Sequence, residues 1–309
     1  MEFNHISVLL KETIDSLNIK DNGTYVDCTI GGAGHAKELL NRNSSVKLIG
    51  FDKDQTALDV SKERLGIFKD RVLLIKDDFK NSPRYLEGKE LKVQGIYADL
   101  GVSSYQIDTA ARGFSFRFDA PLDMRMDTSA SLTAKDIVNT YSQDDLKRII
   151  KDYGEDRFAS SIARKIVEAR KKQEIETTKQ LEKIILSAVP KYKGNDGSSN
   201  VQRTFQAIRI EVNQELDGLK TFIMEAVDRL EPKGRIAIIT FHSLEDRIVK
   251  HTFRELATGC TCPSDFPICV CGKKPKVKII TNHPITASED ELKLNRRSSS
   301  AKLRVVEKL

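Results

Sequence analysis

A glycine-rich turn between two apolar segments carries the residue types of a nucleoside-binding site. Residues 24–29 lead into Gly31-Gly32-Ala33-Gly34-His35, and a second apolar segment, 46–51, ends on Asp52. Glycine has no Cβ and tolerates positive φ, so a ligand can approach the backbone closely there. The helix expected after the turn offers free N–H groups, and Asp52 can accept hydrogen bonds from ribose hydroxyls. The pattern predicts a pocket for a nucleoside cofactor.

Two classes of cofactor fit a glycine turn that is followed by a ribose-binding acid. Nicotinamide and flavin dinucleotides favour Gly-x-Gly-x-x-Gly, because their pyrophosphate rests on the helix N-terminus. Here Ala33 and Ala36 stand where the second and third of those glycines would be. Asp27, just before the turn, would repel a pyrophosphate but could hold the ammonium group of S-adenosylmethionine. The residues favour methyl transfer, and the alternative is hydride transfer by a nicotinamide-dependent oxidoreductase.

Acidic residues stand at the ends of several apolar segments that alternate with helical patterns. Such alternation predicts βαβ units and a mainly parallel sheet, in which ligands sit at the carboxyl ends of the strands. The acids at these predicted ends are Asp27, Asp52, Asp77, Asp78 and Asp99. We therefore expect them along one edge of the sheet.

Asp99 ends the apolar segment 91–100 and has the chemistry needed for methyl transfer to an exocyclic amine. A carboxylate that accepts from the amine N–H makes the nitrogen more nucleophilic and can take up the released proton. Methylation at C5 of a pyrimidine would instead need a cysteine nucleophile, and no cysteine lies near this segment. The structural alternative for Asp99 is a capping acid in a turn.

A long helical stretch interrupts the sheet pattern. Ser or Thr followed three residues later by Asp or Gln, a helix-start signature, occurs at Thr133, Ser142 and Thr177. Apolar segments then resume, with a turn at 231–234 and a strand over 235–240 that ends beside His242, a candidate for chemistry or for packing. We predict an α/β fold whose doubly wound, mostly parallel sheet domain comprises 1–105 and 214–309, with a helical substrate-binding domain inserted over 106–213.

The charge distribution suggests a polyanionic partner. The segment 270–309 has ten lysines and arginines and four acids, so it carries the whole net charge of +6. A basic end on a neutral body suits nucleic acid, with a solvated tail as the alternative. The segment 112–118 mixes cations with aromatic rings, namely Arg112, Phe114, Phe116, Arg117 and Phe118. The rings could stack on unpaired bases or fill a seam between domains. No apolar segment approaches the roughly 20 residues that span a bilayer and no secretory signal is visible, so we expect a cytoplasmic protein.

Four of the five cysteines form two Cys-x-Cys pairs, Cys260 with Cys262 and Cys269 with Cys271. In a chain without a secretory signal, such pairs indicate a metal site rather than disulfides. Four thiolates would hold a tetrahedral zinc ion, although Cys-x-Cys is tighter than the common finger spacing. Zinc and reduced, unligated thiols are both open at this point.

Several longer motifs occur together in a fixed order. They are Asp27-x-Thr29-x-Gly31-x-x-Gly34-His35, Asp99-Leu-Gly-Val-Ser-Ser104-x-Gln106, Arg112-Gly-Phe-Ser-Phe116, Pro121-Leu-Asp-Met-Arg-Met-Asp127, Arg203-Thr-Phe-Gln-Ala-Ile-Arg-Ile210 and Phe241-His-Ser-Leu-Glu-Asp-Arg247. With these motifs nearly the whole chain resembles the RsmH (MraW) family. Members of that family are S-adenosylmethionine-dependent methyltransferases of a cytosine N4 in 16S ribosomal RNA of the small subunit, in the decoding region.

The resemblance implies a class I methyltransferase (Rossmann-like) fold, S-adenosylmethionine as cofactor and ribosomal RNA as partner. It implies cofactor contacts at Ala33, Gly34, His35, Asp52, Phe79, Asp99 and Gln106, of which Phe79 and Gln106 come from the resemblance alone. Together with Asp27 and Gly31, these residues form the predicted cofactor site, with Asp99 as the catalytic residue. A non-catalytic RNA-binding protein that keeps the pocket is the remaining alternative.

Overall fold

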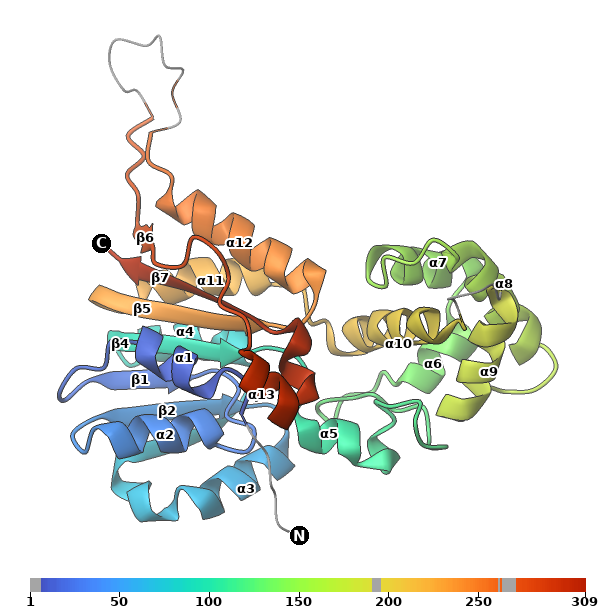
Figure 1. Cartoon of the computed structure of the whole chain (residues 1–309), viewed down its shortest axis with the longest axis horizontal. Coiled ribbons are helices and arrows are strands. Elements are labelled where there is room, and N and C mark those ends of the chain that lie inside the picture. Colours follow the sequence, from blue (N-terminus) through green and yellow to red (C-terminus); the bar gives the residue numbers. More distant parts are fainter. Residues whose placement is uncertain (1–6, 191–195, 261, 263–270) are drawn as a thin grey trace. The chain divides into compact units, whose positions relative to one another are not determined.

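The computed structural model describes residues 7–190, 196–260, 262 and 271–309. The chain divides into two compact units, each drawn in Figure 1. Unit 1 comprises Met1–Gly101 and Asp217–Leu309, and unit 2 comprises Val102–Leu216. Among the described residues, no helix is long and apolar enough to cross a membrane.

Unit 1 is built on one sheet with the strand order β3-β2-β1-β4-β5-β7-β6. Strands β1 to β5 pair in parallel, and β7 runs antiparallel to both β5 and β6. The strands are β1 (Thr24–Asp27), β2 (Lys47–Asp52), β3 (Val72–Lys76), β4 (Val93–Asp99), β5 (Leu230–Thr240), β6 (Val277–Ile279) and β7 (Lys302–Lys308). The order reverses between β1 and β4, where open parallel sheets bind their ligands. The predicted mostly parallel, doubly wound sheet is confirmed.

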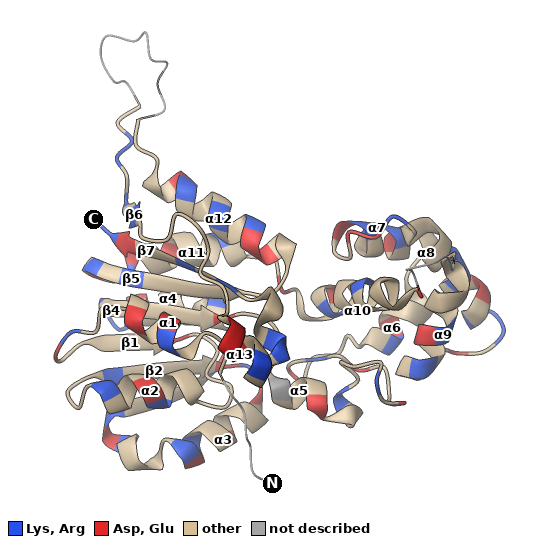
Figure 2. Ribbon diagram, viewed as in Figure 1, with Lys and Arg blue, Asp and Glu red and all other residues tan. Residues whose placement is uncertain are grey.

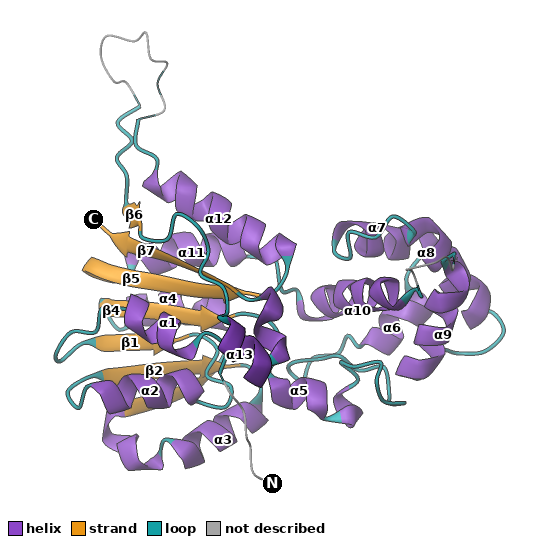
Figure 3. Ribbon diagram, viewed as in Figure 1, coloured by secondary structure: helices purple, strands orange, loops and turns teal. Residues whose placement is uncertain are grey.

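Helices cover both faces of this sheet (Figure 3), because alternate strand residues point to opposite sides. Ile236 and Ile238 belong to one apolar cluster, and Ala237 and Ile239 belong to the other. The first cluster includes residues of α4 (Ser82–Gly88), α11 (Leu219–Asp228) and α12 (Ser243–Ala257). The second includes residues of α1 (Leu10–Ser16), α2 (Gly34–Arg42) and α3 (Gln55–Arg64). Shorter elements of unit 1 are η1 (Gly66–Arg71), η2 (Phe79–Asn81), α13 (Glu289–Leu294) and η4 (Arg296–Ser300).

The start of β5 differs from the sequence-based expectation. β5 begins at Leu230 rather than at Arg235. The predicted turn at 231–234 interrupts its pairing with β4, which shifts register between Leu230 and Arg235, and Lys233 there has a φ of +63°. A Cβ at Gly234 would lie 2.8 Å from the carbonyl oxygen of Glu231 and 3.1 Å from that of Gln94. Only glycine fits this close approach, so Gly234 lets the chain turn tightly against β4 before pairing resumes at Arg235.

The basic C-terminal segment is folded and is not a solvated tail. Strand β7 lies between β5 and β6, and Arg304 on it is buried against Asp246 at the start of α12, with a nitrogen–oxygen distance of 2.6 Å. Figure 2 shows lysines and arginines in blue along the segments that lead into β6 and beside α13. Part of the positive charge therefore has an internal structural role.

Unit 2 is helical and has its own apolar core, which includes Ile149, Ile162, Phe205 and Ile208. Its elements are α5 (Ser104–Asp108), η3 (Ala110–Arg112), α6 (Ala134–Thr140), α7 (Gln143–Asp152), α8 (Ala159–Arg170), α9 (Thr178–Ala188) and α10 (Ser198–Asn213). The predicted helix starts are confirmed: the side chains of Thr133, Ser142 and Thr177 each accept from a backbone N–H three residues later.

Replacing Ile238 by alanine tests the sheet core. Ile238 is fully buried in β5, so Ile238→Ala removes apolar contacts and leaves a cavity, which should lower the free energy of unfolding by about 2–5 kcal/mol. Urea denaturation followed by circular dichroism measures this. The control, Ile67→Ala, truncates the same residue type where it is 81% exposed and should change stability by less than about 0.5 kcal/mol. Equal losses in the two variants would contradict the proposed packing.

Candidate functional site

The glycine turn after β1 is held in place from two sides. Gly31 and Ala33 have φ values of +48° and +60°, so the chain turns through the left-handed region before α2 begins. The Gly31 N–H donates to Asp52 Oδ2 at 2.9 Å, which joins the turn to the end of β2. The Gly31 carbonyl accepts from Ser61 of α3 at 2.8 Å, and Arg64 donates to the Gly32 carbonyl at 2.8 Å. Asp52 therefore shapes the turn as well as lining it.

The segment before α1 packs directly on the start of α2. A Cβ at Gly34 would lie 1.9 Å from Ser7 Oγ, so only glycine allows this approach. His35 is buried, and its Nε2 lies 3.0 Å from the carbonyl oxygen of Val8. Both residues were expected to contact a cofactor. The structure gives them a structural role, which is to join the N-terminal segment to the turn.

Three acids end neighbouring strands: Asp27 is buried, and Asp52 and Asp99 are half-buried. Asp27 is 2% exposed and accepts from the Thr29 N–H at 3.0 Å. The Asp99 N–H donates to Thr29 Oγ1 at 2.7 Å, which places the end of β4 beside the end of β1. The Oδ1 atom of Asp99 is buried, and no described residue forms a hydrogen bond with it. An unsatisfied buried carboxyl oxygen needs a partner, and a ligand can supply one.

Burial and like charge shift the acidity of this edge. Burial, followed by the negative charges of Asp27, Glu245 and Glu291, raises the pKa of Asp99 to about 8. Burial likewise raises the pKa of Asp27 to about 7 and that of Asp52 to about 6. In the described chain, no lysine or arginine forms an ion pair with any of the three strand-end acids. A positively charged ligand would supply the missing countercharge.

An acid that follows β3 differs from these three because it has a cationic partner. Asp78, after β3, forms an ion pair with Lys53 at 3.1 Å. Although burial opposes it, the charge of Lys53 and the hydrogen bond from the Lys80 N–H lower the pKa of Asp78. Phe79 follows and is half-buried, with its ring edge-to-face on Phe222 at a centroid distance of 4.9 Å. Among these described strand-end acids, Asp78 has an ion-pair partner, whereas those at the ends of β1, β2 and β4 have none.

Two further acids act on Asp99 from elements that the sequence did not connect with it. Glu245, in the first turn of α12, accepts from the Phe241 N–H at 3.0 Å and contacts His242 Nε2 at 3.3 Å. Glu291, in α13, accepts from the Leu9 N–H at 2.8 Å. His242 serves as the N-cap of α12, with its Nδ1 accepting from the Glu245 N–H at 3.4 Å. No periodicity or motif in the sequence points to Glu291.

In unit 2, Gln106 caps a helix. Its side-chain oxygen accepts from the Ser103 N–H at 3.0 Å, and its own N–H donates to Ser103 Oγ at 3.2 Å. This capping box starts α5. The residue expected to contact the cofactor therefore has a structural function within its own unit.

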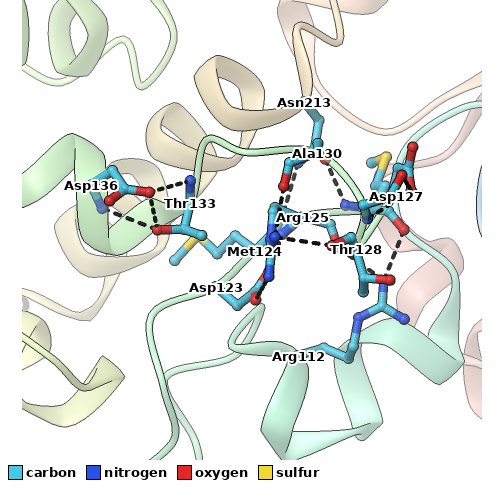
Figure 4. A network of polar contacts seen from close by, with 12 residues as sticks. Arg112, Asp123, Met124, Arg125, Asp127, Thr128, Ala130, Thr133, Asp136 and Asn213 are labelled. Atoms are coloured by element: carbon cyan, nitrogen blue, oxygen red, sulfur yellow. Dashed lines mark hydrogen bonds and ion pairs between the residues drawn. The ribbon is translucent and has the colours of Figure 1, made fainter.

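The long segment between α5 and α6 is fixed by a polar network (Figure 4). Arg112 donates to the carbonyl oxygens of Arg125 and Met126, both at 2.9 Å. Asn213, at the end of α10, donates to the Met124 carbonyl at 2.8 Å and accepts from the Met126 N–H at 2.7 Å. These bonds satisfy backbone groups that no helix or strand would satisfy. Side-chain hydrogen bonds therefore hold this loop in a defined conformation.

Three of the predicted metal-ligating cysteines come together. The Sγ atoms of Cys260, Cys262 and Cys271 lie within 4.8 Å of one another. Cys269 lies outside the described residues.

The strand-end site has the properties of a pocket for a cationic nucleoside. It combines a glycine turn at a helix start, an acid bound to that turn, and carboxyl groups without a cationic partner in the described chain. S-adenosylmethionine, which carries ribose hydroxyls, an ammonium and a sulfonium, fits this donor set. A dinucleotide pyrophosphate would add negative charge beside Asp27 and Asp99, which is unfavourable.

Comparison with known proteins gives consistent matches along the whole chain. A family model described as "MraW methylase family" matches residues 2–309. The chain is 54% identical to ribosomal RNA small subunit methyltransferase H of Lachnospira eligens, over 100% of this chain and 99% of that protein. It is 55% identical to the protein of the same name from Clostridium botulinum (strain Kyoto / Type A2) and 52% identical to that of Finegoldia magna, over 100% of both chains in each case.

The raised pKa values predict how stability depends on pH. Because Asp99 has a higher pKa in the folded than in the unfolded protein, the folded state binds more protons between about pH 4 and pH 8. The stabilisation from protonated Asp99 is thus present at low pH and is lost as the pH rises through about 8. We expect Asp99→Asn to be increasingly more stable than the ligand-free wild type as the pH rises from 5 to about 8.5, measured by urea denaturation at each pH.

The matched control is Asp70→Asn, an acid-to-amide change at an exposed position. Its stability relative to the wild type should stay constant over the same range. A constant difference for Asp99→Asn as well would show that the Asp99 carboxyl is not buried without a countercharge.

Proposed function

Because the chain belongs to the MraW methylase family, we propose that it transfers a methyl group from S-adenosylmethionine to the N4 amine of a cytosine in small-subunit (16S) ribosomal RNA, in the decoding region. The observation that carries the proposal is the set of three strand-end acids beside the glycine turn, Asp27, Asp52 and Asp99, whose pKa values are all raised. The relatives named ribosomal RNA small subunit methyltransferase H support ribosomal RNA as the substrate. A cytoplasmic location goes with this substrate and stays a prediction.

The residues of the strand-end site would divide the recognition of S-adenosylmethionine among them. When bound, this molecule supplies an electrophilic methyl group on a positively charged sulfur. Asp52 has a lone pair left on each carboxyl oxygen for ribose hydroxyls, after its bonds to the N–H groups of Gly31 and Asp54. Asp27 would hold the ammonium group, and the turn from Gly31 to Gly34 allows close approach of the ligand to the backbone.

Asp99 would act on the acceptor nitrogen. As a carboxylate it can accept a hydrogen bond from the cytosine amine, which raises the electron density on N4 and provides a site for the released proton. A pKa of about 8 means that Asp99 is mostly protonated near neutral pH without ligand. A neighbouring positive charge favours the ionised form, so the donor itself would help prepare this base.

Unit 2 and the basic segments of unit 1 would hold the RNA. Phe114 and Phe116 are half-buried and pack against the core of unit 2, which agrees better with a packing role than with stacking on bases. Phe118 is 46% exposed and can stack on an unpaired base. The lysines and arginines of 273–297 in unit 1 would supply positive charge for phosphates.

Asp99→Asn tests the catalytic assignment. The amide keeps the shape of the side chain but cannot take up the amine proton, so turnover should fall by about 10²–10⁴-fold. Methyl incorporation into small-subunit ribosomal RNA, at saturating S-adenosylmethionine, measures turnover. Isothermal titration with S-adenosylhomocysteine checks that the pocket is intact, and Asp70→Asn should keep wild-type turnover. Wild-type turnover in Asp99→Asn would rule out the assigned role.

The target nucleotide has a direct test. Mass spectrometry of 16S ribosomal RNA should show one N4-methylated cytidine in the decoding region that is absent from cells lacking this protein and restored by the wild-type gene. An unchanged modification pattern would reject the proposed substrate, and failure of the Asp99→Asn strain to restore the mark would agree with the assigned role.

Phe118→Ala tests the stacking contact. Loss of one base–aromatic stack costs about 1–3 kcal/mol, so RNA affinity should fall by roughly fivefold to 150-fold. Fluorescence anisotropy with a labelled fragment of the RNA measures this. Leu73→Ala, which truncates an exposed apolar residue of β3 (47% exposed), should bind RNA as the wild type does. Equal affinities for the wild type and Phe118→Ala would remove Phe118 from the RNA-binding surface.

A further inference from the structure

The segment between α12 and β6 gathers thiol groups outside the strand-end site. The Sγ atoms of Cys260, Cys262 and Cys271 lie within 4.8 Å of one another. Cys260 and Cys271 are exposed and Cys262 is half-buried. The methyl-transfer chemistry proposed above uses none of these thiols, and the sheet core does not include them.

The base of this segment is fixed to the fold. The Lys276 N–H donates to the Leu256 carbonyl at 2.8 Å, so the chain returns to the end of α12 before β6 begins. Lys276 also forms an ion pair with Asp228 at 2.8 Å. The chain before β6 is therefore bonded to the end of α12, which keeps Cys260, Cys262 and Cys271 close to one another.

The distances between the thiols suit a shared metal ion. The Sγ atoms of Cys260 and Cys271 are 3.7 Å apart. Two thiolates on a tetrahedral zinc, each with a zinc–sulfur bond of about 2.3 Å, have their sulfurs about 3.8 Å apart. A disulfide would need a separation of about 2.05 Å. The pair thus has the separation of two ligands on one zinc ion.

A backbone contact supports thiolate character at Cys260. The Cys262 N–H points at Cys260 Sγ, with a nitrogen–sulfur distance of 3.4 Å. A donor aimed at sulfur favours its charged form, which is the form that binds metal. Lys273 and Lys274 follow the last of the three cysteines in the sequence, and their charge offsets that of a zinc–thiolate centre.

We propose that Cys260, Cys262 and Cys271 bind a zinc ion, which joins the chain that follows α12 to the chain that precedes β6. Thiolates select soft or borderline metals, and zinc needs no redox partner. Binding replaces the thiol protons by zinc–sulfur bonds and releases those protons to solvent.

Metal content of the full-length protein tests the proposal. The protein is purified under reducing conditions from zinc-supplemented cells and analysed by inductively coupled plasma mass spectrometry. About one zinc per chain is expected, with at least three sulfur neighbours at about 2.3 Å by X-ray absorption at the zinc edge. In the double variant Cys260→Ser/Cys271→Ser, zinc should fall to background, and proteolytic cleavage within 258–276 should become faster.

The thiol-matched control is Cys28→Ser, which removes the cysteine at the end of β1 and should keep its zinc, with circular dichroism checking that it folds. Zinc-free wild type with reduced thiols overturns the proposal. So does zinc retained in the double variant, or a Cys260–Cys271 disulfide in the protein as isolated. None of these outcomes depends on methyl transfer, so the proposed function can stand or fall separately.

Discussion

The crowding of carboxyl groups at one sheet edge is the constraint on which the rest of unit 1 depends. Parallel pairing of β1, β2 and β4 brings Asp27, Asp52 and Asp99 to the same edge. In water each carboxyl group would be ionised at neutral pH. Here the pKa values are raised to about 7, 6 and 8, because the ionised forms are less favourable at this edge than in water. Acids with strongly shifted pKa values are common at functional sites, where a bound ligand compensates for their unfavourable charge.

Both ends of the sequence help to build the surroundings of these acids. The N-terminal segment contacts the turn through Ser7 at Gly34 and through Val8 at His35. Leu9 then binds Glu291 of the C-terminal helix α13, whose charge acts on Asp99. Residues far apart in the chain thus determine the electrostatic environment of Asp99.

The parts of the structure that local patterns determine could be predicted from the sequence. Strand-end acids, the glycine turn and the helix starts at Thr133, Ser142 and Thr177 follow from periodicity and capping chemistry, and the structure confirms them. The early start of β5 at Leu230 could not be predicted, because Pro232 and Gly234 indicate a turn without showing whether the residue before it pairs with a neighbouring strand.

Long-range contacts set the roles that the sequence left open. The cofactor contacts of Gln106 and His35 stay predictions, and the structure adds internal bonds to Ser103 and Val8 that the motifs did not indicate. Glu291 carries no motif at all, because its effect on Asp99 depends on where α13 packs. The strand-end acids therefore predicted only part of the negative charge around the site.

The acidity of Asp99 joins the binding of the donor to the activation of the acceptor. A carboxyl with a pKa of about 8 is mostly neutral at pH 7 and then donates a proton where the reaction needs an acceptor. A sulfonium beside it favours the carboxylate. In the proposed reaction Asp99 would thus become a base only when the methyl donor is present. The burial that makes the empty pocket less stable at high pH is, on this argument, what makes the acceptor chemistry conditional on the cofactor.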